Sequence, residues 1–285
     1  MKRTTLGLLM VAGLVRAGVV EDVREQIKND DYRAAQTIID RNMTGTGATP
    51  ELIEAISWMG RGLLAKKDYP AADKYAQQAY TLATAALKKR RQLDLEPHLP
   101  LALGAAIEVQ ANVLAATGAR SEAIVYLNDE LKKYYSTSIR TRIQKNINLL
   151  SLEGKPAPAI QGKPLALLAK DKPAIVFFWA HWCPDCKKEA PILLRLKQEF
   201  GARGLVIVAP TQKYGYTAEA ENVPPQVEVP YIEQVRQKYY AGLVDAPARI
   251  SEETFRNYGA STTPTLVLVD RKGICLLYTS DAADE

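Results

Sequence analysis

The chain has 285 residues, of which 47% are apolar and 24% are charged, enough to build two ordinary hydrophobic cores. The formal net charge of +5 is mild and spread along the chain, and the sharpest basic cluster, residues 88–91, ends a helical pattern. Cations at a helix end complement its dipole, so the charge excludes a nucleic-acid footprint and we expect no nucleic-acid partner.

Residues 1–17 have the pattern of an export signal: the basic residues Lys2 and Arg3, an apolar run over 6–15, and small residues before Gly18. The apolar run is shorter than the roughly 20 residues that span a bilayer. The absence of a Cys near the cleavage point argues against a lipoprotein. We therefore expect export to the periplasm, or to another extracytoplasmic compartment, of a bacterial cell. The alternative is that the run is the first helix of the next domain.

Residues 18–152 are rich in Ala, Leu, Gln, Lys and Glu, which predicts an almost entirely helical domain. Three related segments are each expected at a helix–turn–helix junction: DYRAA at 31–35, DYPAA at 68–72 and ARSEA at 119–123. Small residues upstream, Gly60 and Ala111, would let paired helices approach closely. The pattern resembles tetratricopeptide (TPR) hairpins with irregular spacing. Such a TPR-like domain either binds a partner segment or serves as a packing spacer.

Proline and glycine residues mark the passage into a second domain, residues 153–274. There we expect a buried strand over 172–180, a helix over 183–200 that Pro191 kinks, and a parallel strand over 204–209. Strands that alternate with helices in this way predict an α/β fold.

The strand delivers Cys183-Pro184-Asp185-Cys186 to the start of the helix. This arrangement places two sulfurs within bonding distance at an exposed edge, and the helix dipole favours the thiolate form of the first one. Such a pair is suited to reversible thiol–disulfide exchange. A zinc site is the alternative, but structural zinc usually takes four ligands in two short-spaced pairs, and this chain has three Cys and two His with no second pair. We expect no metal and no cofactor.

More than fifty residues separate 209 from 263, which leaves room for an inserted segment. We expect one helix around 231–240 and a second that Ser251 caps and Gly259 closes. Loops next to reactive groups often select substrates, so this insert is expected to form a rim around the cysteines.

Three ordered motifs together resemble the thioredoxin superfamily, and more narrowly its TlpA/ResA-type extracytoplasmic thiol–disulfide oxidoreductases. The motifs are GKPAP at 154–158, FWAHWCPDCKKEAP at 178–191 and TTPTLVLVDRKG at 262–273. They cover less than half of the chain. The expected architecture is therefore an all-α TPR-like domain followed by an α/β thioredoxin-like fold.

Residues 275–285, CLLYTSDAADE, resemble the translation of a transposase sequencing adaptor. They begin where the resembled family would start its last strand and final helix. We therefore leave this segment, Cys275 included, out of the expected fold and expect the thioredoxin-like domain to be C-terminally truncated. The alternative is a naturally short, polar tail.

The resemblance implies roles for particular residues. Cys183 is the expected nucleophile, Cys186 resolves the mixed disulfide, and Glu189 handles protons at the cysteines; the alternative for Glu189 is an ordinary solvated surface residue. Thr263 and Pro264 are expected to form a cis peptide opposite the cysteines that pairs with a substrate strand. Trp182 would shield the disulfide and offer apolar contact.

Two neighbours of the motif bear on this chemistry. His181 would stabilise a thiolate when protonated, although an exposed loop histidine is the favoured interpretation. Many thioredoxins carry a buried Asp at the position of Phe177, which leaves Glu189 as the nearest candidate to replace that acid.

The expected function is reduction of protein disulfides, with protein thiols and disulfides as substrates and a membrane protein as electron donor. Asp185 opposes a neighbouring thiolate, which argues against a strongly oxidising pair. A disulfide oxidase or isomerase is one alternative. The other is a redox-sensing adaptor in which the helical domain binds a partner without turnover.

Overall fold

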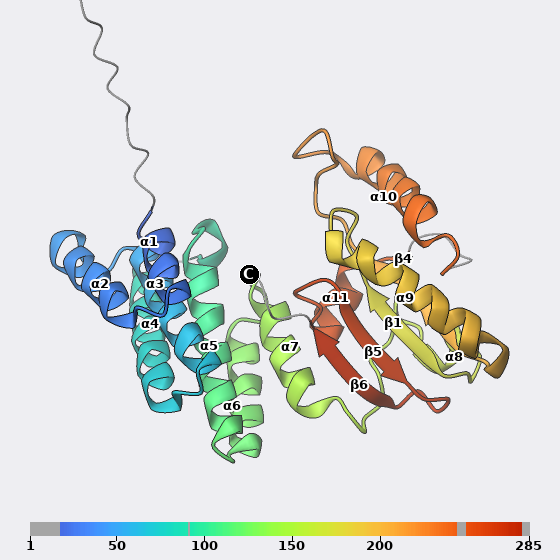
Figure 1. The fold of residues 1–285 in the computed structure, drawn as a ribbon, viewed down its shortest axis with the longest axis horizontal. Coiled ribbons are helices and arrows are strands. Elements are labelled where there is room, and N and C mark those ends of the chain that lie inside the picture. Colours follow the sequence, from blue (N-terminus) through green and yellow to red (C-terminus); the bar gives the residue numbers. More distant parts are fainter. Residues whose placement is uncertain (1–17, 91, 244–248, 281–285) are drawn as a thin grey trace, which may run out of the picture.

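The computed structural model describes residues 18–90, 92–243 and 249–280 of the chain. The predicted export signal at 1–17 and residues 281–285 lie outside the described residues. In Figure 1 a helical half, coloured blue to green, lies beside an α/β half, coloured yellow to red.

The helical half consists of seven helices, in line with its composition. They are α1 (Val19–Lys28), α2 (Tyr32–Thr46), α3 (Pro50–Ala65), α4 (Tyr69–Arg90), α5 (Leu99–Ala116), α6 (Arg120–Lys133) and α7 (Arg140–Ser151), with a short 3-10 turn η1 (Leu93–Leu95). Helices α1 and α2, α3 and α4, and α5 and α6 pack as successive hairpins, and the first helices of neighbouring hairpins also touch.

The predicted junctions are confirmed, since α2, α4 and α6 begin at Tyr32, Tyr69 and Arg120. In the two DY segments the aspartate caps the new helix: Asp31 accepts a hydrogen bond from the Ala34 N–H (2.8 Å) and Asp68 accepts one from the Ala71 N–H (3.2 Å). Shared capping chemistry therefore explains why these segments recur.

Gly60 lies where α3 crosses α4, as the small-residue pattern predicts. A Cβ there would lie 3.3 Å from the Ala72 carbonyl oxygen and 3.4 Å from the Ala76 backbone nitrogen. A larger residue would therefore push α3 away from α4.

Among the described helices, α5 alone has the length and apolar composition to cross a membrane. In this fold α3, α4, α6 and α7 pack around it, and most of its apolar residues are buried. It therefore forms the central helix of the helical core.

The α/β half is built on a four-stranded sheet of order β2-β1-β5-β6. Strand β1 is parallel to β2 and antiparallel to β5, and β5 pairs antiparallel with β6. Its elements are α8 (Leu165–Ala169), β1 (Ala174–Phe178), α9 (Pro184–Phe200), η2 (Gly201–Arg203), β2 (Val206–Val208), β3 (Pro210–Thr211), α10 (Pro225–Tyr240), β4 (Arg249–Ile250), α11 (Glu252–Tyr258), β5 (Thr265–Val269) and β6 (Cys275–Ser280). This β–α–β unit followed by a hairpin is the expected thioredoxin-like arrangement.

Strand β1 is buried on both sides, which explains its continuous apolar run. Phe178 packs into one core with Phe255 and Tyr258 of α11, while Phe177 packs into the other with Tyr240 of α10. The sheet is thus covered on both faces, and the carboxyl end of β1 leads directly to α9.

Two segments differ from the expectations. Helix α10 begins at Pro225, six residues before the predicted start, because Pro225 is a favourable first helical residue. The structure also pairs residues 275–280, which we leave out of the expected fold, with β5, and the Tyr278 hydroxyl donates to the Tyr258 carbonyl oxygen (2.7 Å). A strand ladder is made by backbone groups, so the origin of this segment stays a prediction.

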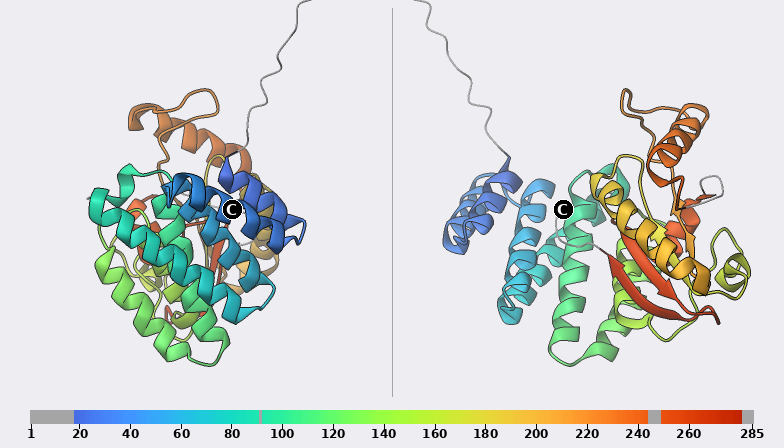
Figure 2. Two further views of the ribbon diagram at one scale, coloured as in Figure 1. Left: turned by 90° about the vertical axis from the view of Figure 1, so that its left-hand side faces the viewer. Right: turned by 45° about the vertical axis from the view of Figure 1, so that its right-hand side comes forward.

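The two halves meet where α7 packs against α11 and touches β6 (Figure 2). The buried Asn148 of α7 donates its amide N–H to the Tyr258 carbonyl oxygen at the end of α11 (2.8 Å). Gly259, which follows α11, lies directly against the α7 backbone at Lys145. The helical half is therefore fixed to the element that precedes β5.

Candidate active site

Cys183 and Cys186 form a disulfide at the start of α9. Cys183 is the N-cap residue, and its sulfur accepts a hydrogen bond from the Cys186 N–H (3.0 Å). Pro184 is the first helical residue, where its missing N–H costs no hydrogen bond. The predicted strand–CxxC–helix arrangement therefore places both sulfurs at the positive end of the α9 dipole.

Thr263 and Pro264 lie against this disulfide. The register of the sheet explains why: β5 runs antiparallel to β1, and Thr265 pairs with Phe178. The residues just before β5 therefore meet the residues just after β1. The Thr263–Pro264 peptide is cis, and the Thr263 carbonyl oxygen lies 3.4 Å from the Cys183 sulfur.

Both cysteines are covered, although the sequence pattern predicts sulfurs at an exposed edge. Cys183 is 1% exposed and Cys186 is 0% exposed. They belong to the apolar core that Phe177, Trp179 and Tyr240 share, with Tyr214 and Tyr231 packed against it. Tyr214 and Tyr231 come from the distant insert, so the local pattern around the cysteines could not indicate that they pack against this core.

His181 is also buried, which corrects the expectation of an exposed loop histidine. Its side chain contacts the rings of Tyr214, Tyr216 and Tyr231, with centroid distances of 5.2 to 5.6 Å. Its Nε2 atom lies 2.9 Å from the Tyr216 carbonyl oxygen. A carbonyl only accepts hydrogen bonds, so Nε2 carries the proton and Nδ1 is the bare nitrogen.

The surroundings of His181 keep it neutral. Burial lowers the pKa of the imidazole below its usual range, against smaller opposing effects from the Tyr216 carbonyl and the Glu228 carboxylate. The Nδ1 atom is buried and has no hydrogen-bond partner among the described residues. A thiolate next to this loop therefore gains no cation from His181 at neutral pH.

Glu228, which lies on α10 within the insert, fixes the loop that carries Tyr214 and Tyr216. Its buried carboxylate accepts hydrogen bonds from the backbone N–H groups of Tyr214 and Gly215. No site role was predicted for Glu228 or for the three tyrosines, and their local signal was the closely spaced Tyr214-Gly-Tyr216. The insert does form the predicted rim, because its tyrosines contact the residues that precede Cys183.

The remaining predicted residues lie around the disulfide with different exposures. Trp182 is 45% exposed and its ring meets Tyr214 edge-on. Glu189 is half-buried on α9, five residues after its first residue, Pro184. Asp185 pairs with Lys188 on the helix surface (2.7 Å), which weakens its effect on the neighbouring sulfurs. Phe177, which stands where many thioredoxins carry a buried Asp, is fully buried. Strand β1 contains no acidic residue.

Residues 157–276 match the family model described as AhpC/TSA family. Together with the sheet topology, this match supports a thioredoxin-like fold for the α/β half.

Curated relatives carry thiol–disulfide names. The chain is 30% identical over 132 residues to the thiol:disulfide interchange protein DsbE of Pseudomonas aeruginosa, covering 44% of this chain and 64% of that one. It is 37% identical over 83 residues to HelX of Rhodobacter capsulatus (24% and 45%) and 27% identical over 128 residues to ResA of Bacillus thuringiensis (42% and 65%). The chain thus spans less than two thirds of each relative.

Solved structures also match part of the chain. The thioredoxin domain of a thiol-disulfide oxidoreductase from Bacteroides vulgatus matches at 21% identity and a TM-score of 0.34, covering 45% of this chain and 88% of that one. A thiol:disulfide interchange protein from Chlorobium tepidum matches at 21% identity and a TM-score of 0.33, covering 46% and 90%.

Proposed function

We propose that this chain is an extracytoplasmic thiol–disulfide oxidoreductase that reduces protein disulfides through Cys183 and Cys186. The observation that carries the proposal is the disulfide at the N-terminus of α9 with the Thr263 carbonyl beside it. The thiol–disulfide names of the curated relatives support the reaction class. The export pattern at residues 1–17 supports the location.

The proposed reaction begins with both cysteines reduced. The Cys183 thiolate attacks one sulfur of a substrate disulfide; the substrate S–S bond breaks and its other sulfur leaves as a thiolate that takes up a proton. Cys186 then loses its proton and attacks the Cys183 sulfur, which releases the second substrate thiol. Two electrons and two protons have passed to the substrate, and the Cys183–Cys186 disulfide remains.

Two features of the site suit these steps. The dipole of α9 and the Cys186 N–H both stabilise negative charge on the Cys183 sulfur. The backbone at Thr263 lies beside that sulfur and would align an extended substrate segment by main-chain hydrogen bonds. In this proposal Glu189 takes up the Cys186 proton, and Trp182 provides apolar contact for the substrate.

Restoring the dithiol needs two electrons from outside the chain. We assign this step to a dithiol-bearing membrane protein, which would reduce the disulfide by the same exchange in reverse. Neutral His181 supplies no cation to a thiolate at the site, and a reduced form that is little stabilised favours a reductant.

The reduction potential of the Cys183/Cys186 pair tests the direction of electron flow. We expect a value near about −270 mV in glutathione or dithiothreitol buffers, as for a reducing thioredoxin-type pair. A value near about −120 mV would make the protein a disulfide donor instead. Cys183→Ser separates the enzyme from a redox-sensing adaptor, because loss of insulin-disulfide turnover supports catalysis and unchanged turnover contradicts it.

A further inference from the structure

The proposed reaction requires access to the Cys183 sulfur, yet the structure leaves almost none. Cys183 is 1% exposed, and thiol–disulfide exchange needs a third sulfur to approach the bond that breaks. Some of the groups around the disulfide must therefore move before a substrate reacts. The chain segments that border the site differ in how they are held, and this difference indicates which of them moves.

Two of these segments are fixed by the core of the domain. Helix α9 packs on the sheet through its buried residues. The loop before β5 is anchored at one end where Thr265 pairs with Phe178, and at the other where Gly259 lies on α7. Neither segment can shift without loss of backbone pairing or of core packing.

The third segment is residues 214–216 of the insert, which we call the tyrosine loop. Tyr214 meets the Trp182 ring edge-on at a centroid distance of 5.6 Å, and it packs against the apolar core to which Cys183 belongs. Tyr214 and Tyr216 also contact the ring of His181, two residues before Cys183. The tyrosine loop therefore lies against the residues that lead into the disulfide.

Glu228 provides two of the bonds that hold the tyrosine loop. Its carboxylate, on a residue that is 1% exposed, accepts hydrogen bonds from the N–H groups of Tyr214 and Gly215. The Gly215 carbonyl accepts from the Val223 N–H (2.8 Å), and the last carbonyl of the loop accepts from His181 Nε2. These partners lie in the insert or just before Cys183, and not in the four-stranded sheet. The tyrosine loop can therefore move without disturbing the sheet, and Glu228 sets its position.

Three polar side-chain atoms next to the disulfide segment are buried without a hydrogen-bond partner among the described residues: His181 Nδ1, Thr262 Oγ1 and Thr263 Oγ1. Buried polar atoms in this state favour any arrangement that supplies the missing bonds. A peptide segment carries backbone donors and acceptors along its whole length. Such a segment can supply these bonds as it takes the place of the tyrosine loop.

We propose that Glu228 is a positioning residue that holds the tyrosine loop against the disulfide segment, and that the loop makes the site select extended protein segments over small disulfides such as oxidised glutathione. The inference rests on the proposed function and adds its substrate class. Displacing the loop costs free energy. A protein segment recovers this cost from the exposed Trp182 ring and the Thr263 backbone, whereas glutathione offers far less surface for these contacts.

The test measures the rate at which oxidised glutathione oxidises the reduced full chain. Oxidised glutathione takes up two electrons and two protons and leaves as two thiols, while the Cys183–Cys186 bond forms. We expect Glu228→Gln and Tyr214→Ala to raise this rate by about fivefold or more, because the first releases the tyrosine loop and the second removes its ring. Tyr214→Phe, which keeps the ring, should stay within about twofold of the wild-type rate.

Two further readouts separate access from other effects. Reduction of the disulfide by glutathione should accelerate by the same factor as its formation, because a change in access lowers the barrier in both directions and leaves the equilibrium constant unchanged. Insulin-disulfide turnover should rise by a smaller factor than the glutathione rate, so the preference for a protein substrate falls in Glu228→Gln and Tyr214→Ala.

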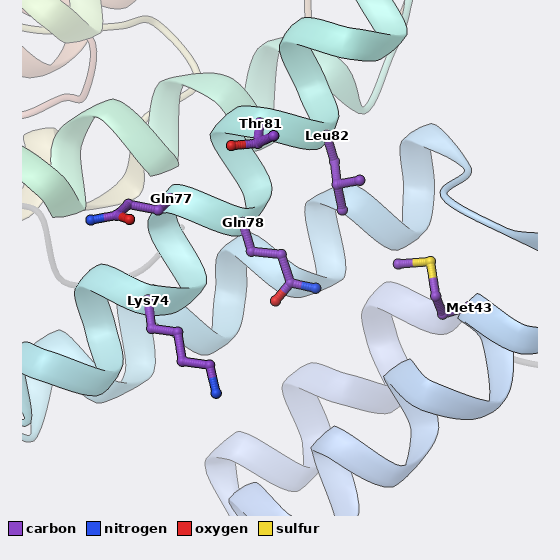
Figure 3. A pocket seen from close by; sticks show the side chains of 6 residues that line it. All are labelled: Met43, Lys74, Gln77, Gln78, Thr81 and Leu82. Carbon is purple, nitrogen blue, oxygen red and sulfur yellow. The ribbon is translucent and has the colours of Figure 1, made fainter.

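Two control variants account for net charge. Glu219→Gln removes the same charge as Glu228→Gln, but from an exposed position of the insert. Lys74→Gln removes the opposite charge from the groove between α2 and α4 in the helical half, which Figure 3 shows. Both should change the glutathione rate by less than about twofold.

Several outcomes would overturn the inference. Unchanged glutathione rates in Glu228→Gln and Tyr214→Ala would show that the tyrosine loop does not limit access, and equal acceleration in Glu219→Gln would assign the effect to charge. An equilibrium constant that shifts by the same factor as the rate would mean that Glu228 stabilises one redox state instead. If circular dichroism shows that Glu228→Gln is unfolded, Tyr214→Ala decides the question.

The outcomes also distinguish this inference from the proposed function. Insulin turnover by the wild-type chain without acceleration in any variant contradicts the role of the tyrosine loop alone. Acceleration of the glutathione reaction in a chain that does not turn over insulin contradicts the proposed function, and with it the selection of protein segments, but supports the role of Glu228 in access.

Discussion

Gly259 fixes the helical half to the thioredoxin-like half, and Gly259→Ala is the sharpest test of that junction. The residue has φ = +63°, and a Cβ atom there would lie 2.2 Å from the Lys145 backbone nitrogen and 2.5 Å from its Cα. Both atoms belong to the α7 backbone and have no rotamer to change. Helix α7 would have to retreat from α11 by about 1 Å to restore an ordinary contact.

The structure sets the size of the effect. An alanine in the left-handed region costs about 1–2 kcal/mol. Retreat of α7 adds an overpacking term of about 1–3 kcal/mol and stretches the buried Asn148–Tyr258 hydrogen bond, worth about 1 kcal/mol. We therefore expect Gly259→Ala to lower the free energy of unfolding by about 3–6 kcal/mol.

Gly118 provides the control for backbone strain. It follows α5 with φ = +94°, and no atom lies within 4 Å of the Cβ that an alanine would add. Gly118→Ala therefore reports the cost of the left-handed conformation alone, about 1–2 kcal/mol. The difference between the two variants measures the contact with α7.

Urea unfolding of the full chain, followed by circular dichroism at 222 nm, gives both values, and amide hydrogen exchange in α7 locates the change. In Gly259→Ala we expect faster exchange in α7 around Lys145. Equal destabilisation by the two variants, with unchanged exchange in α7, would refute the tight packing of the two halves.

Glu108 makes the helical half sensitive to acid: desolvation raises the pKa of its carboxyl, but the adjacent cations outweigh this and hold it at about 2. About 3 kcal/mol of stability is therefore lost as pH falls from 4.5 toward 2, and Glu108→Gln should flatten the acid-unfolding curve. Burial lowers the pKa of His181, so stability is also lost as pH falls below about 6.5. His181→Gln, which keeps an N–H for the Tyr216 carbonyl, should remove that slope in urea titrations. Cys186→Ser should accumulate a substrate mixed disulfide on Cys183 in non-reducing gels, which Cys183→Ser should not.

Local sequence patterns predicted the features that local chemistry determines. Ser251 caps α11 by accepting from the Thr254 N–H, and Gly259 closes it, as the sequence indicates. The continuous apolar run placed β1, and Cys183 marked the start of α9. In each case the signal lies within a few residues of the feature it forms.

Features made by distant residues escaped prediction. The tyrosines that enclose His181 come from 33 to 50 positions further along the chain, and the carboxylate of Glu228 holds their loop through backbone N–H groups. Backbone donors leave no trace in the side-chain pattern. The same holds for the α7–α11 junction, where Asn148 bonds to a carbonyl oxygen.

The junction at Gly259 is close in sequence to the loop that faces the disulfide. Asn148 holds the carbonyl of Tyr258, Gly259 lies on α7, and four residues later the Thr263 carbonyl reaches the Cys183 sulfur. The loop that faces the disulfide therefore starts from a residue that the helical half fixes and ends in β5, which β1 fixes. Both ends of the loop are anchored in buried structure, so the position of Thr263 depends on the helical half as well as on the sheet. A helical domain attached in this way contributes to the geometry of the disulfide site through its contacts with the residues that precede the loop.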